Sequence, residues 1–164
     1  MFFSVIDSLS KCIYPKKGNR DRIVSYVSEF GEWEYRNRVS LPHLYQLLYK
    51  SPEPAFSELR KFVNSEYGKW GSGEIVGLER DPDIKDVLKY WPKENEHKKP
   101  LSGITVEFLQ HINLLYSHRN YLIHELRTPG YGIDSYNEGY PYYISFSHIS
   151  NDHSEDIETW ELTY

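Results

Sequence analysis

The residues best suited to chemistry are Arg119, Asn120 and His124, near the end of the longest helical pattern in the chain. Histidine can move protons near neutral pH, and arginine can hold a phosphate group. On an ideal helix, the step from Arg119 to His124 turns the two side chains about 140° apart and raises them by about 7.5 Å. A shared site therefore requires a bent helix or a second copy of the chain, whereas Asn120 and His124 already share a face.

Arg119 also interrupts an apolar stripe in this pattern, which runs from residue 105 to residue 131. Steps of four and three residues predict one continuous buried seam, with His111 and His118 on the outer face. The apolar members of the seam are Phe108, Ile112, Leu115, Leu122 and Leu126. A charged side chain in such a seam is costly unless it is paired or solvated. The arginine therefore indicates a functional site, an interface, or a salt bridge where two helices cross.

The order of Arg119, the polar Asn120 and then His124, late in a small helical protein, resembles the signature of the HEPN superfamily. In that signature an arginine is followed by four to six residues, the first typically polar, and then a histidine. The resemblance covers roughly residues 1 to 128 and implies a metal-independent endoribonuclease of toxin–antitoxin or antiviral-defence type. His124 would be the acid or base, Arg119 would hold the phosphate, and Asn120 would orient one of them.

The resemblance further implies a homodimer through the motif helix, RNA as substrate, no cofactor, and an antitoxin or defence-system partner. The alternative is a non-catalytic HEPN-like binding or dimerisation module in which Arg119 forms an interface ion pair. A third possibility is a toxin silenced by nucleotidyl transfer to a tyrosine. The family tyrosine lies two positions after the histidine, where this chain has Leu126, although Tyr131 is nearby.

Five shorter helices are expected before the motif helix, at residues 3–14, 20–30, 41–50, 55–70 and 83–91. Ser40 is expected to cap the third of them. The spacing predicts that the first helix buries one apolar face, made of Phe2, Val5, Ile6, Leu9 and Ile13. A basic surface between the first two helices is equally consistent with RNA contact and with a solvated turn. The candidate RNA-binding residues are Lys16, Lys17, Arg20, Arg22 and Arg127.

The composition changes near residue 128. Residues 128–164 contain no Lys or Arg and seven acidic side chains, so this segment carries about −7, whereas residues 1–127 carry +2 from 19 basic and 17 acidic side chains. Alternating aromatic and β-branched residues at 142–148 and 157–164 predict a β-hairpin. The predicted fold is mainly α, a HEPN-like helical bundle at 1–128 with an acidic, tyrosine-rich hairpin at 129–164 packed on the same domain.

The sequence also gives expectations about the cellular location of the protein and about metal binding. The single cysteine, Cys12, favours a reducing cytosol, and the sequence has neither a basic leader nor an apolar run of membrane-spanning length. A cytoplasmic protein without membrane contact is therefore expected. His148, Asp152 and His153 are a weak metal candidate, because no established metal-ligand spacing occurs, and no metal is predicted.

Overall fold

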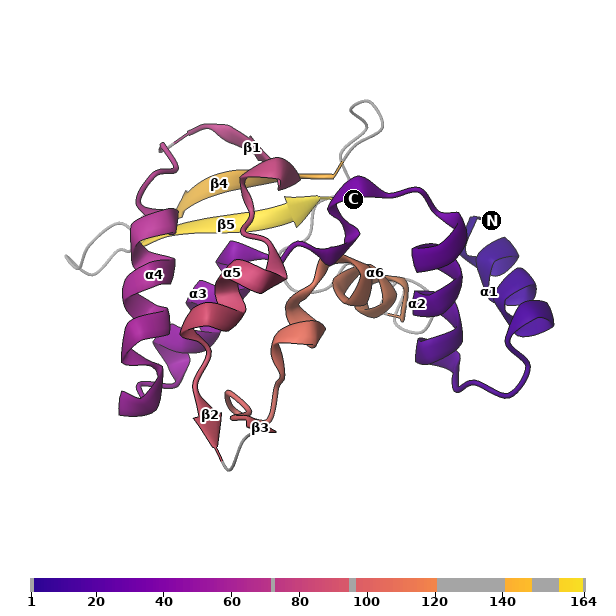
Figure 1. Cartoon of the computed structure of the whole chain (residues 1–164). Coiled ribbons are helices and arrows are strands. Elements are labelled where there is room, and N and C mark those ends of the chain that lie inside the picture. The colour runs from indigo at the N-terminus through magenta and orange to yellow at the C-terminus, as the bar shows by residue number, and fades with distance from the viewer. Residues whose placement is uncertain (1, 72, 95–96, 121–140, 149–156, 164) are drawn as a thin grey trace.

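The computed structural model describes residues 2–71, 73–94, 97–120, 141–148 and 157–163. This part of the chain is mainly helical, as predicted, with a small antiparallel sheet (Figure 1). The α-helices are α1 (Phe2–Ile13), α2 (Asn19–Phe30), α3 (Leu41–Lys50), α4 (Ser57–Tyr67), α5 (Ile84–Tyr90) and α6 (His111–Asn120). Short 3₁₀ helices are η1 (Glu34–Asn37), η2 (Pro54–Phe56), η3 (Leu78–Arg80) and η4 (Val106–Leu109). The strands are β1 (Ile75–Gly77), β2 (Lys93–Glu94), β3 (His97–Lys98), β4 (Tyr142–His148) and β5 (Ile157–Thr163).

The predicted C-terminal hairpin is confirmed. β4 and β5 pair antiparallel over their whole length, from Tyr142 opposite Thr163 to His148 opposite Ile157. β1 adds a third strand on the other edge of β4, with Gly77 opposite Tyr142, so the sheet order is β1-β4-β5. A two-stranded hairpin is marginal in water, and a third strand together with a packed face makes it stable.

The motif helix begins later than its sequence pattern suggests. The prediction of one unbroken helix from residue 105 is wrong at Gln110, where the backbone is extended (φ −69°, ψ 146°) between η4 and α6. This break changes which side chains share a face. Phe108 is 47% exposed, although the seam pattern predicted its burial, while Ile112 is buried. His111 and His118 are also buried, which contradicts their predicted place on an outer face.

The described residues form two apolar cores. The larger one joins α3, α4, α5 and η4 to the sheet, and Tyr143 of β4 and Leu162 of β5 are among its buried members. The smaller one consists of Ile6, Ile23, Val27 and Ile112, and therefore links α1 and α2 to α6. In Figure 1, α1 and α2 lie together at one end of the molecule, beside α6.

The first helix uses less of its apolar surface than expected. Ile6 is buried in the smaller core, but Val5, Leu9 and Ile13 are 51%, 42% and 47% exposed. These three residues follow one another at intervals of four, so they form an apolar stripe on the outside of α1. The prediction that the whole apolar set is buried is therefore wrong for these three, because α2 covers only the Ile6 side of the helix.

Candidate functional site

Arg119 and Asn120 are the last two described residues of α6, and they are in direct contact. Nη1 of Arg119 donates a hydrogen bond to Oδ1 of Asn120 over 2.9 Å. The Arg119 side chain is only 12% exposed. The structure thus brings the arginine and the polar residue of the predicted site together, and it holds the guanidinium mostly under the surface.

Asp7 of α1 faces two guanidinium groups. Its Oδ1 accepts a hydrogen bond from Nη2 of Arg22, at 2.8 Å, and lies 3.5 Å from Nη2 of Arg119. Arg22 is also 12% exposed and Asp7 is 33% exposed. We call Asp7, Arg22 and Arg119 the arginine–aspartate cluster. Since two positive side chains share one carboxylate, the cluster carries one positive charge in excess.

The hydrogen bonding of this cluster is incomplete. The Nε atoms of Arg22 and Arg119 are both buried and have no hydrogen-bond partner among the described residues. A buried donor without a partner destabilises the protein by roughly 1 to 3 kcal/mol. Excess positive charge and unused donors are features that favour an anion such as phosphate.

Arg119 also packs on the smaller core. Together with apolar side chains of α1, α2 and α6 it lines a small cavity, whose other residues are Ile6, Ile23, Val27, Ile112, Leu115 and Tyr116. An ion pair with Asp7 at this helix crossing corresponds to the structural alternative for a charged residue in an apolar seam. The pair joins α1 to α6, whereas the Arg22 pair joins α1 to α2.

The third residue of the predicted catalytic set, His124, lies outside the described residues, as does Arg127. The geometry between Arg119 and His124 therefore stays a prediction from the helical spacing.

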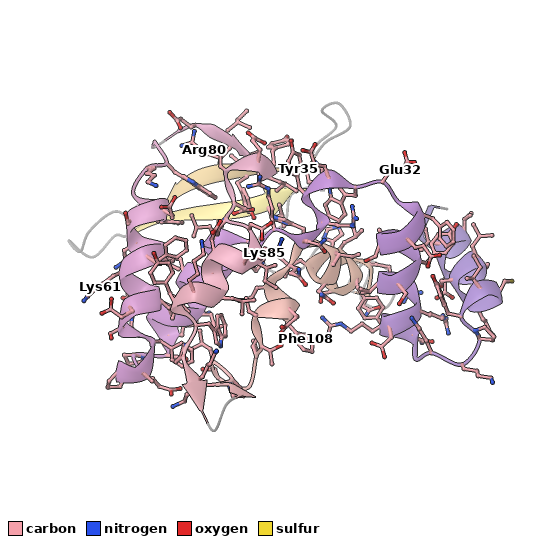
Figure 2. The ribbon with its side chains drawn as sticks, in the orientation of Figure 1. Glu32, Tyr35, Lys61, Arg80, Lys85 and Phe108 are labelled. Carbon is pink, nitrogen blue, oxygen red and sulfur yellow. The ribbon has the colours of Figure 1, made fainter. Side chains whose placement is uncertain are left out.

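The predicted basic surface is largely engaged in contacts within the chain. Nε of Arg20 donates to Asn113 Oδ1 over 3.1 Å, and its guanidinium lies 3.8 Å from the centre of the Phe108 ring. Phe108 lies on η4 and is labelled in Figure 2. Burial lowers the pKa of Arg20, while Tyr116 and Asp21 act in the opposite direction. Lys17 donates to Ser25 Oγ over 2.7 Å, whereas Lys16 is exposed. Since Arg22 belongs to the arginine–aspartate cluster, the basic residues do not form one continuous free surface.

Sequence reasoning missed a buried polar network in the larger core. Tyr143 lies 2.7 Å from Asp81 Oδ2 and 2.8 Å from Ser40 Oγ, while His111 Nε2 lies 2.6 Å from the same Asp81 oxygen. Ser40 Oγ is 2.7 Å from His43 Nδ1. We call Ser40, His43, Asp81, His111 and Tyr143 the Asp81 network. All of its members except His43 are fully or almost fully buried.

The proton positions in this network follow from its acceptors. An ionised Asp81 can only accept, so His111 donates to it through Nε2 and Tyr143 donates its single hydroxyl proton. The Tyr143 oxygen then accepts from the Ser40 hydroxyl, and Ser40 accepts from Nδ1 of His43. His111 Nδ1 is buried without a partner among the described residues. The network therefore runs as a directed chain that ends on one carboxylate.

The Asp81 network explains two local features of α3. Ser40 occupies the predicted N-cap position, but its side chain makes no capping hydrogen bond. Instead, Asp81 Oδ1 accepts from the backbone N–H of Leu41 over 2.8 Å. The pKa of His43 is lowered, chiefly by burial and then by His111. His43 is nevertheless exposed at the surface, so water offsets part of this effect.

The Asp81 network is placed to hold the fold together rather than to act on a substrate, because Ser40, Asp81, His111 and Tyr143 are out of reach of solvent. Its members come from α3, the segment after η3, α6 and β4. No short motif joins residues so distant in sequence. The local sequence around Asp81 is Asp81-Pro82-Asp83, which predicts the start of a helix. It does not indicate that the Asp81 carboxylate is buried.

The described residues provide neither a metal site nor a membrane-spanning helix. Within them, no three His, Cys, Asp or Glu side chains are grouped so that they could hold a metal ion. Asp152 and His153 of the weak metal candidate lie outside this part of the chain. Of the helices in the described ranges, none has the length and the apolar character needed to cross a membrane.

Arg119 and Asn120 are the part of the predicted catalytic set that the structure describes, and the Arg119 guanidinium is already paired with the Asp7 carboxylate. No protein-family model, no curated protein and no solved structure matches this chain.

Proposed function

We propose that this protein is a metal-independent endoribonuclease of toxin or antiviral-defence type. The observation that carries the proposal is the arginine–aspartate cluster, in which Arg22 and Arg119 share one carboxylate and retain one excess positive charge. This charge lies directly beside Asn120, four residues before His124. Cleavage of RNA requires at least a group that binds the phosphate and a neighbouring acid or base that transfers a proton.

The chemistry needs no metal, because RNA supplies its own nucleophile. In the proposed reaction, a base takes the proton from the 2′-hydroxyl, whose oxygen attacks the adjacent phosphorus. The bond to the 5′-oxygen breaks, and that oxygen receives a proton. His124 serves as the acid or base, Arg119 neutralises charge on the phosphorus-centred transition state, and Asn120 orients one of them. The products are a 2′,3′-cyclic phosphate and a 5′-hydroxyl.

The proposal includes a homodimer, since the helical spacing turns Arg119 and His124 about 140° apart on one straight helix. Two motif helices at a two-fold axis would place Arg119 of one copy near His124 of the other. The proposal also includes a cytoplasmic location, which rests on the single cysteine, Cys12, and on the absence of a basic leader from the sequence. The antitoxin or defence-system partner comes from the HEPN resemblance alone.

The test is a cleavage assay of the purified protein on total tRNA in the presence of EDTA. We expect cleavage products with 2′,3′-cyclic phosphate ends, and we expect His124→Ala and Arg119→Ala to abolish cleavage. The matched controls are His97→Ala and Arg80→Ala, which remove a histidine and an exposed arginine without an assigned role. Cleavage that EDTA abolishes, or that survives in His124→Ala, contradicts the proposed mechanism.

The second candidate is a non-catalytic binding or dimerisation module. The observation that favours it is the Arg119–Asp7 ion pair. This pair gives the arginine, whose side chain is only 12% exposed, a structural partner. For such a module, His124→Ala changes neither folding nor partner binding, and no cleavage of RNA is detected for the parent protein. The tRNA assay therefore separates the two candidates directly.

A further inference from the structure

A large pocket lies on a part of the molecule that the proposed function does not use. Three segments form it: the connection after α2, the chain from β1 through η3, and the start of β4. Its volume is about 900 Å³, within the range of small-molecule sites. The lining residues are Glu32, Trp33, Glu34, Tyr35, Ile75, Gly77, Leu78, Glu79, Pro141 and Tyr142. We call it the glutamate–aromatic pocket; two of its lining residues, Glu32 and Tyr35, are labelled in Figure 2.

The charge of this pocket is one-sided. Glu32, Glu34 and Glu79 contribute three carboxylates, and neither Lys nor Arg occurs among its described lining residues. Within the described part of the chain, none of these carboxylates forms a salt bridge. An anionic ligand would therefore meet repulsion here, and a cation would find unused acceptors.

Two guanidinium groups lie near the pocket, but they are directed at backbone oxygens. Arg36 donates to the carbonyl of Trp33 over 2.7 Å, and Arg38 donates to the carbonyl of Glu79 over 2.9 Å. The Arg38 guanidinium also lies 5.6 Å from the centre of the Tyr35 ring. These contacts attach the walls of the pocket to the rest of the protein. Because both arginines donate to backbone carbonyls, they do not pair with the glutamate carboxylates of the pocket.

Aromatic side chains supply the apolar part of the wall. Trp33, Tyr35 and Tyr142 are each half-buried. Trp33 packs against both apolar cores, and its ring centre is 6.2 Å from that of the buried His111, so it is a fixed surface. The faces of such rings attract organic cations, and they also provide apolar area on which an aliphatic chain can pack.

Gly77 determines where one of the carboxylates lies. A Cβ atom at this position would overlap with the Glu79 carboxylate, so the missing side chain provides the space that Glu79 fills. The backbone dihedral angles of Gly77 (φ −76°, ψ 161°) lie in the extended region, which any residue can adopt. Gly77→Ala should therefore displace the Glu79 carboxylate and leave the strand conformation unchanged.

We propose that the glutamate–aromatic pocket binds alkylammonium groups, as carried by a linear polyamine or by lysine side chains of a basic peptide. The aliphatic chain would lie on Trp33, Tyr35 and Tyr142, and the ammonium groups would pair with the glutamates. A metal cation fits less well, since the described residues offer no group of three ligating side chains placed for one. The pocket shares no residue with the arginine–aspartate cluster, so this proposal stands apart from RNA cleavage.

The test is isothermal titration calorimetry of the full chain at low salt with two probes, spermidine and an acetyl-Lys-Lys-Lys-amide peptide. We expect at least one to bind with a dissociation constant below about 1 mM, and the stronger probe identifies the source of the alkylammonium group. The neutral 1,8-octanediol should not bind, because the carboxylates provide the attraction.

Two variants localise the binding. Replacing all three acids, as Glu32→Gln with Glu34→Gln and Glu79→Gln, should weaken binding at least about tenfold. Gly77→Ala should weaken it less, by about threefold, through the displaced Glu79. The matched control, Asp21→Asn with Glu58→Gln and Asp86→Asn, removes the same charge from other elements and should change affinity less than about twofold.

Circular dichroism verifies that each variant is folded. Absence of binding by both probes at millimolar concentration overturns the proposal. Equal losses in the pocket variant and in the control variant overturn it as well, because they show attraction to the general negative charge of the protein. A tenfold loss confined to the pocket variant supports it.

Discussion

His111 Nε2 lies 2.6 Å from Asp81 Oδ2 in the larger core, and both side chains are shielded from solvent. The same carboxylate accepts the Tyr143 hydroxyl and the backbone N–H of Leu41. One side chain thus satisfies donors from α6, β4 and the start of α3. Because buried donors are costly without an acceptor, Asp81 links the helices to the C-terminal hairpin.

The first prediction concerns this carboxylate. Asp81→Ala should lower the free energy of unfolding by about 3 to 5 kcal/mol, because the buried donors of His111 and Leu41 lose their acceptor. The Tyr143 hydroxyl loses Asp81 but keeps Ser40. Urea denaturation followed by circular dichroism measures the loss. The control is Asp86→Ala, which should change the free energy of unfolding far less, because water screens its exposed pair with Lys89. A loss below about 1 kcal/mol for Asp81→Ala would show that the network does not stabilise the fold.

The second prediction uses Asp7 to distinguish a phosphate site from a structural ion pair. Asp7→Asn should lower the free energy of unfolding by roughly 1 to 2 kcal/mol, since two mostly buried guanidiniums lose their shared carboxylate. It should also raise affinity for RNA, because the carboxylate no longer competes with phosphate for Arg22 and Arg119. Fluorescence anisotropy with labelled tRNA measures this affinity.

The control for Asp7→Asn is Asp21→Asn, which changes the net charge equally and lies on the exposed side of α2. It should raise RNA affinity much less at the same salt concentration. If both variants bind RNA as the parent does, the arginine–aspartate cluster is not a phosphate site, whatever its effect on stability.

The third prediction is a homodimer through the motif helix. Light scattering should give twice the chain mass of 19.5 kDa at micromolar concentration. Leu9→Glu, on the exposed stripe of α1, should leave the dimer intact, because that stripe is not on α6. A monomer that cleaves RNA would contradict this prediction, because one chain would then be enough to form the active site. A dimer that Leu9→Glu dissociates would place the interface on α1 instead.

The fourth prediction concerns the acidic C-terminal segment. The sequence predicts that Asp152, Glu155, Asp156 and Glu158 are surface acids, and exposed charges contribute little to stability. Changing them to Asn or Gln should therefore leave the chain folded. The affinity for RNA should rise, most strongly at low salt, where screening is weakest. The reason is the segment charge of about −7 beside a body of +2. An unchanged affinity at low salt in a folded variant would mean that the segment is only scaffold.

Local sequence signals determined much of the secondary structure. Ser40 followed by Leu41 and Pro42 predicts a helix start, and α3 begins at Leu41, as the predicted range 41–50 requires. Leu41, Leu44 and Leu48 have helical spacing, and all three are buried. The hairpin strands alternate along their length, and β4 and β5 pair as predicted. Such signals are local, because spacing and capping depend on neighbours within a few residues. They also identified Arg119 as an exception in its seam.

Tertiary structure decided the partners. The sequence could not show that Asp7, more than a hundred positions away, pairs with Arg119, or that Arg22 shares the same carboxylate. It could not show that the break at Gln110 turns His111 inward toward Asp81, which reverses the face that an unbroken helix predicts. The physical reason is that periodicity fixes which residues share one side of a helix, whereas the choice of contact is made by the other elements that pack there.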